Sequence, residues 1–454
     1  MIAVKKKSTT RDMTTGSIGK QILLFALPLM LGNIFQMLYN TVDSVVVGNF
    51  VGTQALAAVG STTMIINMLV FFFNGFAIGA GVVIGRYFGA KNMKELHKSI
   101  ETTMAATLVM CVVFTVVGVL AVEPMLRFMS TPEDVFGEAS VYLRIYNAGF
   151  SGLLIYNMGS GILRAVGDTT RPLYFLVLTS VLNIILDLLF VLVFHMGIAG
   201  VAYATILSQF ISAGLTLRLL TASRDVYRVT WHDLRIDGGI LGQIISVGLP
   251  AGIQSVITAF SNVFVQSYIN FFGSGVMASW SCFNKLDQFI MLPMQSMAMA
   301  STTFVSQNIG AGKTKRAEQG TFAAVGLTLL VTGVILAFLQ IFAASCVSLF
   351  TKDQVVIEYG TIFVHTLAGF MLFNCVNHVL AGALRGMGDS RGPMVIMLLS
   401  FVAIRQVYLY VMTHFFLNTP VSVGMGYPVG WTSCCIIEVC YFLIRRKKLL
   451  GGDV

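Results

Sequence analysis

The sequence predicts an all-α integral membrane protein with twelve transmembrane helices in two six-helix lobes. Three observations predict this fold: 56% of the residues are hydrophobic, only 11% are charged, and the chain repeats its pattern at an offset of 221 to 222 residues. Soluble domains carry about 25% charged residues. A soluble core could not bury this much apolar surface, so lipid must be the solvent for much of it.

Apolar stretches long enough to cross about 30 Å of hydrocarbon recur along the chain. The first follows Lys5, Lys6, Lys7 and Arg11, which resembles the start of a signal peptide. It is too long for a signal core and has no A-x-A site, so we expect an uncleaved first helix. The predicted spans are 21–47, 55–84, 100–122, 139–162, 172–194, 198–220, 240–270, 276–304, 318–343, 357–382, 393–416 and 424–444.

The basic residues predict the orientation. If the amino terminus is cytoplasmic, 24 of the 29 Lys and Arg residues fall in inside segments, as the rule for membrane insertion requires. Topology therefore explains the net charge of +9, and we expect no nucleic-acid partner. The seven cysteines show no CxxC or Cys/His metal spacing. We expect a monomer in a bacterial cytoplasmic (inner) membrane, with both termini in the cytoplasm.

Two loops carry the clearest copies of the repeat. Gly161-Ile-Leu-Arg164-Ala-Val-Gly167-Asp168 matches Gly382-Ala-Leu-Arg385-Gly-Met-Gly388-Asp389. Leu27-Pro28 and Leu249-Pro250 match at the same offset, as do Asn40 and Asn262. Phe88-Gly89-Ala90 matches Ile309-Gly310-Ala311 as well. Four matches in register make chance improbable, and an even number of helices per copy gives both copies the same orientation. The repeats must then be related by a pseudo-two-fold axis along the membrane normal.

The repeat defines the predicted domains. An N-terminal lobe covers 1–221, a polar cytoplasmic connector covers 222–239, and a C-terminal lobe covers 240–454. Two similar bundles suit alternating access. Pro28 and Pro250 each lie early in a long helix, where a missing N–H predicts a kink. Whether that kink bends during transport or only shapes packing stays open at this point.

These motifs resemble a known family. Leu27-Pro28 leading to Asn40-Thr41-Val42-Asp43, the paired LRxxGD loops, and Asn183-Ile-Ile-Leu-Asp187 are similar to the multidrug and toxic compound extrusion (MATE) family of secondary transporters. The resemblance covers nearly the whole chain. It implies a transporter and not an enzyme. In agreement, the sequence shows no nucleophile–base grouping, P-loop or metalloprotease motif.

Two acidic residues at membrane depth are the first functional candidates, because ionisable groups there are costly. Asp43 shares a helical stripe with Gln36 and Asn40, and Asn183 and Asp187 are four residues apart on one face. The repeat positions of Asp43, Asn183 and Asp187 carry Val265, Ile404 and Tyr408. Folding of a lobe therefore does not require the acids, which favours a coupling-ion site. A neutral, hydrogen-bonded structural carboxyl is the alternative.

The MATE resemblance places such a site in the first lobe and adds a threonine of the sixth helix, here Thr205. One branch of the family uses a carboxylate in the seventh helix. This sequence has Gln254, Thr258 and Asn262 there, and is similar to the DinF-like branch instead. The coupling ion would be H⁺ or Na⁺, with no other metal and no organic cofactor.

Further polar residues are candidates for a substrate cavity. Arg405 and Glu438 stand at similar predicted depth and are expected to form a structural salt bridge, while His378 is either a packing residue or a proton relay. The cavity candidates are Gln36, Asn40, Gln254, Thr258, Asn262, Lys285, Asp287, Asn374 and His378.

The sequence thus predicts an ion-coupled antiporter that exports drugs or other small, often cationic or aromatic, solutes by alternating access. Its partners would be these small molecules and the lipid bilayer. Two alternatives are a flippase for a lipid-linked oligosaccharide precursor, which would need a more cationic cavity, and an intramembrane enzyme.

Overall fold

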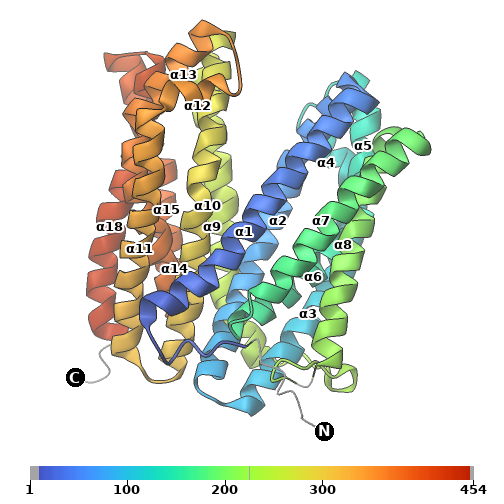
Figure 1. Ribbon diagram of the computed structural model, residues 1–454, viewed down its shortest axis with the longest axis vertical. Coiled ribbons are helices and arrows are strands. Elements are labelled where there is room, and N and C mark those ends of the chain that lie inside the picture. Colours follow the sequence, from blue (N-terminus) through green and yellow to red (C-terminus); the bar gives the residue numbers. More distant parts are fainter. Residues whose placement is uncertain (1–9, 224, 450–454) are drawn as a thin grey trace. The chain divides into compact units, whose positions relative to one another are not determined.

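The computed structural model describes residues 10–223 and 225–449. Lys5, Lys6, Lys7 and Arg224 of the predicted cytoplasmic residues, and both ends of the chain, lie outside the described residues. The described chain is built from helices that form two compact units (Figure 1). Unit 1 contains Met1–Asp12 and Leu27–Leu249, and unit 2 contains Met13–Ala26 and Pro250–Val454.

The units differ from the predicted lobes in two helices. Helix α1 (Ile18–Val46) begins in unit 2 and continues in unit 1 after Ala26, and α9 (Gly238–Asn270) passes from unit 1 to unit 2 after Leu249. The lobes follow the sequence repeat, whereas the units follow packing. Both changes of unit lie at the Leu-Pro pairs of the repeat. Neither proline interrupts its helix, and the kinks stay a prediction.

Unit 1 packs its helices around α6, which contacts α2, α3 and α8, while α7 lies against α8. Two clusters of buried apolar side chains fill it, one of them around Phe73 and Phe150. After α1 its helices are α2 (Thr53–Gly89), α3 (Met93–Leu120), α4 (Val122–Phe128), α5 (Glu133–Ala148), α6 (Phe150–Ala165), α7 (Thr170–Leu188) and α8 (Gly197–Ala222), with π-helical turns η1 (Val47–Val51) and η2 (Leu189–Val193) and a 3₁₀ turn η3 (Trp231–Asp233).

Unit 2 is organised around α10 (Ser274–Gly310) and α14 (Met371–Gly386), which pack on each other. Trp280 and Phe363 lie in the middle of its main apolar cluster. The remaining elements are α11 (Thr314–Ile341), α12 (Ala343–Ser348), α13 (Gln354–Leu367), η4 (Ala368–Phe370), α15 (Arg391–Leu398), η5 (Leu399–Ile404), α16 (Arg405–Val411), η6 (Met412–Phe416), α17 (Pro420–Gly424) and α18 (Gly426–Leu449).

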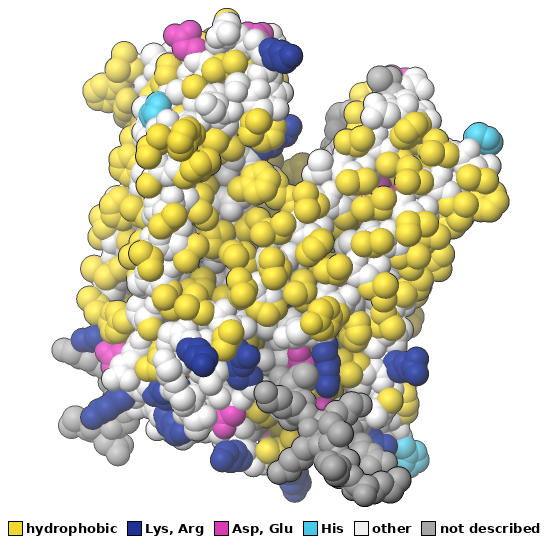
Figure 2. Space-filling view, viewed as in Figure 1, with side chains coloured by type: hydrophobic (Ala, Val, Ile, Leu, Met, Phe, Trp, Pro, Cys, Tyr) yellow, Lys and Arg dark blue, Asp and Glu magenta, His cyan; other side chains and the backbone are white. Residues whose placement is uncertain are grey.

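Ten helical segments of the described chain are long and apolar enough to cross a membrane. The predicted spans 139–162 and 276–304 are helical too. The first is divided between α5 and α6, which are 16 residues long each. The second lies within α10, where Lys285 and Asp287 make it more polar. With these two, the described chain forms the predicted twelve membrane helices. Hydrophobic side chains cover the middle of each unit's visible face, and most Lys and Arg gather near its lower end (Figure 2).

The repeated LRxxGD loops fold alike for two local reasons. Gly167 and Gly388 have φ of +87° and +92°, where an L side chain would be strained. The carboxylates that follow cap the next helix: Asp168 Oδ1 accepts the Thr170 and Arg171 N–H groups at 3.2 Å, and Asp389 Oδ1 accepts that of Gly392 at 3.0 Å. Because both features are backbone requirements, they explain why the duplicated loops kept Gly and Asp.

In unit 1 this loop is tied to the connector by a charged cluster. Arg171 Nε lies 3.5 Å from Asp168 Oδ2, and its Nη1 donates to the Tyr227 hydroxyl and lies 3.6 Å from Asp225 Oδ2. The Tyr227 hydroxyl donates to Asp225 Oδ2 at 2.7 Å. This hydrogen bond, with help from Ser223 and Arg171, holds the pKa of Asp225 below its ordinary value.

We therefore expect Asp225 to stabilise the fold in a pH-dependent way. A carboxyl whose pKa is lowered on folding contributes stability above its unfolded pKa, near pH 4, and loses it as the pH falls through the folded value. Asp225→Asn should lower the midpoint of thermal unfolding in detergent at pH 7, and the difference from the wild type should shrink as the pH falls below about 4. Asp134→Asn, at an exposed site, is the control. A constant difference at every pH would contradict the assignment.

The close approach of α2 and α9 in unit 1 gives a second prediction. A Cβ on Gly79 would lie 2.4 Å from the Ile244 carbonyl oxygen and 2.7 Å from the Gly248 nitrogen, whereas one on Gly60 of the same helix would meet nothing within 4 Å. We expect Gly79→Ala to destabilise by about 1–3 kcal/mol through overpacking. Gly60→Ala should be neutral or stabilising. Unfolding midpoints in detergent test the pair, and equal midpoints would contradict it.

Candidate functional site

The two predicted acids come together where two helices change their winding. Asp43 lies near the end of α1, one turn before η1, and Asp187 lies at the end of α7, directly before η2. The two π-helical turns contact each other. Single π turns occur often at functional sites, where they redirect side chains. Here they place the ends of α1 and α7 side by side.

The Asp43 and Asp187 carboxyl groups face each other closely enough to interact. Asp187 is completely buried, and neither of its oxygens has a hydrogen-bond partner among the described residues. The same holds for Asp43 Oδ1 and for both side-chain polar atoms of Asn183. A buried polar atom without a hydrogen-bond partner is costly, so this cluster is suited to bind a proton, an ion or a water molecule.

The other predicted members of the site lie nearby. Asn183 is one helical turn before Asp187 and 3% exposed, and Thr205 of α8 is 8% exposed. The Thr205 hydroxyl donates to the Val201 carbonyl at 3.0 Å, which leaves its lone pairs free to accept. Carboxylate, amide and hydroxyl oxygens suit either a proton or a hard cation such as Na⁺.

Sequence reasoning missed the tyrosines around the acids. Tyr39 and Tyr142 both interact with the Asp43 and Asp187 carboxylates, and Tyr146 accepts a 3.4 Å hydrogen bond from Gln209 Nε2. Tyr39 was detectable, since it lies four residues before Asp43 on the same helical face. Tyr142 and Tyr146 belong to α5, whose position no sequence pattern gives.

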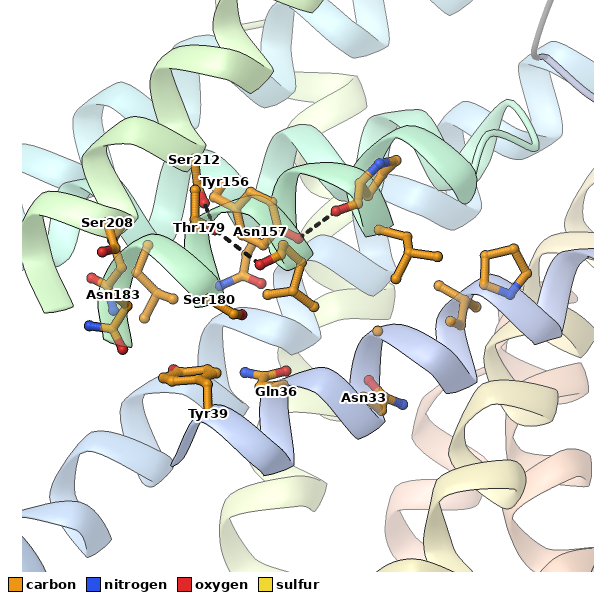
Figure 3. Close-up of a pocket in the computed structure, with 18 of the residues that line it drawn as sticks. Asn33, Gln36, Tyr39, Tyr156, Asn157, Thr179, Ser180, Asn183, Ser208 and Ser212 are labelled. Atoms are coloured by element: carbon orange, nitrogen blue, oxygen red, sulfur yellow. Dashed lines mark hydrogen bonds between the residues drawn. The ribbon is translucent and has the colours of Figure 1, made fainter. Parts of the chain in front are cut away.

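A cavity of about 140 Å³, lined by both polar and apolar side chains, lies in unit 1 between α1, α6, α7 and α8 (Figure 3). Tyr39, Gln36 and Asn33 reach it from α1, across from Ser180 and Asn157. Asn183 and Thr205 also line its wall. Gln36, a predicted substrate-cavity residue, thus lines this cavity, and its role there stays a prediction. Asn40 is exposed and does not line this cavity.

The candidates of the seventh predicted helix are held in hydrogen bonds within unit 2. Gln254 Oε1 accepts from Arg385 Nη1 at 3.4 Å, and its Nε2 contacts the Met397 sulfur. The Thr258 hydroxyl donates to the Gln254 carbonyl at 2.8 Å. These side chains line up along α9, and Gln254 shares its neighbour Arg385 with His378.

The remaining candidates of unit 2 are dispersed. Lys285 Nζ stands 5.2 Å from the centre of the Phe350 ring, and Asp287 Oδ1 is buried without a partner among the described residues. Asn374 Nδ2 contacts the Met291 sulfur at 3.4 Å. His378, one turn further along α14, is half-buried and interacts with Arg385. No shared site for these four emerges.

The predicted Arg405–Glu438 salt bridge is wrong. Arg405 is 2% exposed and donates to Phe401 O at 2.9 Å, Asn262 Oδ1 at 3.1 Å and Ser261 Oγ at 2.6 Å. Glu438 accepts from Cys434, and its charged neighbour is Arg385. Equal depth says nothing about the direction in which a side chain points around its helix. The unforeseen π turn η5, directly before Arg405, changes that direction.

Comparisons with known proteins agree with this architecture. The MatE family model matches the chain twice, over 28–189 and 250–411. The chain is 30% identical to the probable multidrug resistance protein YpnP of Bacillus subtilis, covering 97% of this chain and 98% of the relative, and 27% identical to YoeA of the same organism, covering 97% and 96%. The outward-facing structure of a multidrug resistance MATE family transporter of the MOP superfamily matches with a TM-score of 0.91 at 25% identity, covering 98% of this chain and 99% of that one.

The fold and these matches define a polytopic α-helical membrane transporter of small solutes. The chain belongs to the MatE family, the multidrug and toxic compound extrusion transporters. The two family matches also confirm the internal repeat, because they begin at Pro28 and Pro250. Membership agrees with the expectation that the protein is not an enzyme and that it crosses the membrane several times.

Proposed function

We propose that this protein exports drugs or other small, often cationic or aromatic, solutes from the bacterial cytoplasm in exchange for H⁺ or Na⁺. Relatives named as multidrug resistance and multidrug export proteins support the choice of substrates. It works in the cytoplasmic (inner) membrane as a monomer, with both termini inside, and has no nucleic-acid partner.

The observation that carries this proposal is the pair of facing carboxyls in unit 1. Two negative charges in surroundings of low dielectric repel strongly, and a bound proton or Na⁺ removes the repulsion. The unpartnered atoms of Asp187 and Asn183 give that ion its ligands. In the second repeat the same positions are Val265, Ile404 and Tyr408, so one copy of the fold holds the ion and the other has none of these ligands.

Exchange follows if ion binding changes the preferred conformation. An ion can shift such an equilibrium only by its differential affinity for the two states. Asp43 and Asp187 sit on different helices, so their separation depends on how α1 packs against α7. A conformation that holds the carboxyls together binds the ion tightly, and one that separates them releases it. Alternating access then couples this step to solute release on the outside.

We expect Asp43→Asn and Asp187→Asn each to reduce ion-driven export to the level of cells without the protein, because an amide cannot hold the exchanged charge. Membrane insertion and expression should be unchanged. Asp134→Asn, at an exposed carboxylate of α5, is the matched control and should export normally. Normal drug resistance in either site variant, at matched expression, would remove the site assignment.

Proteoliposomes with separately imposed gradients identify the coupling ion. We expect one of the two gradients, H⁺ or Na⁺, to drive uptake of a fluorescent cation such as ethidium by the transporters that are inserted inside-out in the proteoliposomes. The other gradient should have no effect. The Asp187→Asn protein should respond to neither. If no gradient changes ethidium movement in the wild type, drug–ion exchange is wrong.

A further inference from the structure

The cavity of unit 1 is lined by polar atoms that have no partner. Ser180 Oγ, Ser208 Oγ and Gln209 Oε1 are buried without a hydrogen bond among the described residues, as are both polar atoms of Asn183. Ser180, Ser208 and Asn183 are only 6%, 5% and 3% exposed. Polar groups buried in this way are normally satisfied by ordered water, and a water needs about 10–15 Å³ of such space. A cavity of about 140 Å³ therefore holds several waters.

The cavity lies beside the acidic pair, neither member of which is among its lining residues, and it reaches a loop of unit 1. At one end lie Ser208 of α8 and Asn183 of α7 (Figure 3). Asn183 is one helical turn from Asp187. Asn157 and Tyr156 follow on α6, and at the other end stand Arg164 and Thr169, in and beside the LRxxGD loop that is predicted to be cytoplasmic. Hydroxyl and amide groups share the intervening wall with apolar side chains such as Leu153, Leu173 and Leu176. The hydroxyls both donate and accept hydrogen bonds.

We propose that this hydrated cavity is the route by which the coupling ion passes between Asp187 and the cytoplasm, with Arg164 as the electrostatic barrier at its mouth. The inference rests on the proposed ion-coupled function. It assigns the ion a path through the interior of one unit.

The second repeat keeps only part of the polar lining. The positions of Ser180, Asn183 and Ser208 are occupied there by the apolar residues Phe401, Ile404 and Val429. Those of Asn157, Thr179 and Ser212 stay polar, as His378, Ser400 and Ser433, and Arg164 keeps its counterpart, Arg385. The two copies therefore differ at these three lining positions, one of them Asn183, which lies one helical turn from Asp187.

Arg164 is suited to prevent a leak. It lines the cavity, no Asp or Glu is among the lining residues, and it forms no ion pair within the described part of the chain. A fixed guanidinium in such a passage raises the energy of any cation that crosses it. A coupled transporter needs such a barrier, because an open hydrated path would dissipate the ion gradient.

The test uses purified full-length protein in liposomes with three readouts: ethidium uptake driven by the effective gradient, leak of H⁺ (internal pyranine) and Na⁺ (a sodium dye) without drug, and ethidium binding in detergent. Ser180→Phe introduces the residue of the second repeat. We expect binding to persist while ion-driven uptake falls several-fold. Ser208→Val, a smaller change, should act in the same direction and keeps the test valid if Ser180→Phe fails to fold.

Arg164→Gln should act in the opposite way and raise the leak of the coupling ion several-fold, whereas Arg164→Lys, which keeps the charge, should restore a tight protein. Thr107→Val is the control, since this buried hydroxyl on α3 bonds to the Thr103 carbonyl away from the cavity. Wild-type uptake in Ser180→Phe and Ser208→Val, or an unchanged leak in folded Arg164→Gln, would overturn the route. Wild-type coupling in Asp187→Asn would instead overturn the proposed function.

Discussion

The burial of two carboxyl groups against each other is the constraint on which the rest of this structure depends. A single buried carboxylate is expensive, and a facing pair costs more unless a cation shares the site. Asp43 and Asp187 meet because α1 and α7 both end in π turns that contact each other. Tyr39 and Tyr142 complete a polar pocket inside an otherwise apolar bundle. Only one repeat carries such a pair of acids, so packing of the six-helix scaffold does not require it.

The two repeats share a scaffold and differ in charge. Both keep a glycine with positive φ and a capping aspartate in the LRxxGD loop. The first buries two acids, whereas the second buries the Arg405 guanidinium at a neighbouring repeat position, held by Ser261 and Asn262. Asn262 corresponds to Asn40, which is exposed on α1. The duplicated frame therefore holds a pair of acids in one copy and, in the other, a hydrogen-bonded guanidinium together with the buried Glu438.

The sequence was sufficient for features that depend on hydropathy, spacing and repetition. The helices, the repeated loops and the shared face of Asn183 and Asp187 follow from such patterns, whereas the grouping of Asp43 with them was implied by the resemblance to a known family. Features that depend on rotation about helix axes did not follow. The pairing of Arg405 with Glu438 failed because depth does not fix direction, and Tyr142 was missed because nothing in the sequence places α5 beside α1. The π turns leave no signature in hydropathy, although they shift every side chain that comes after them.

In the proposed function, ion binding inside unit 1 must change the conformation of the rest of the molecule, and the helices that pass between the units are relevant to that change. Helix α1 lines the cavity through Gln36 and Tyr39, yet its first residues pack with unit 2. The change of unit falls at Leu27-Pro28, and in α9 it falls at Leu249-Pro250. Proline removes a backbone hydrogen bond and makes a helix easier to bend at that point. Asp43 and the Leu27-Pro28 step lie on one continuous helix, so in the proposed function the ion site and the point where α1 changes unit are joined by α1 itself.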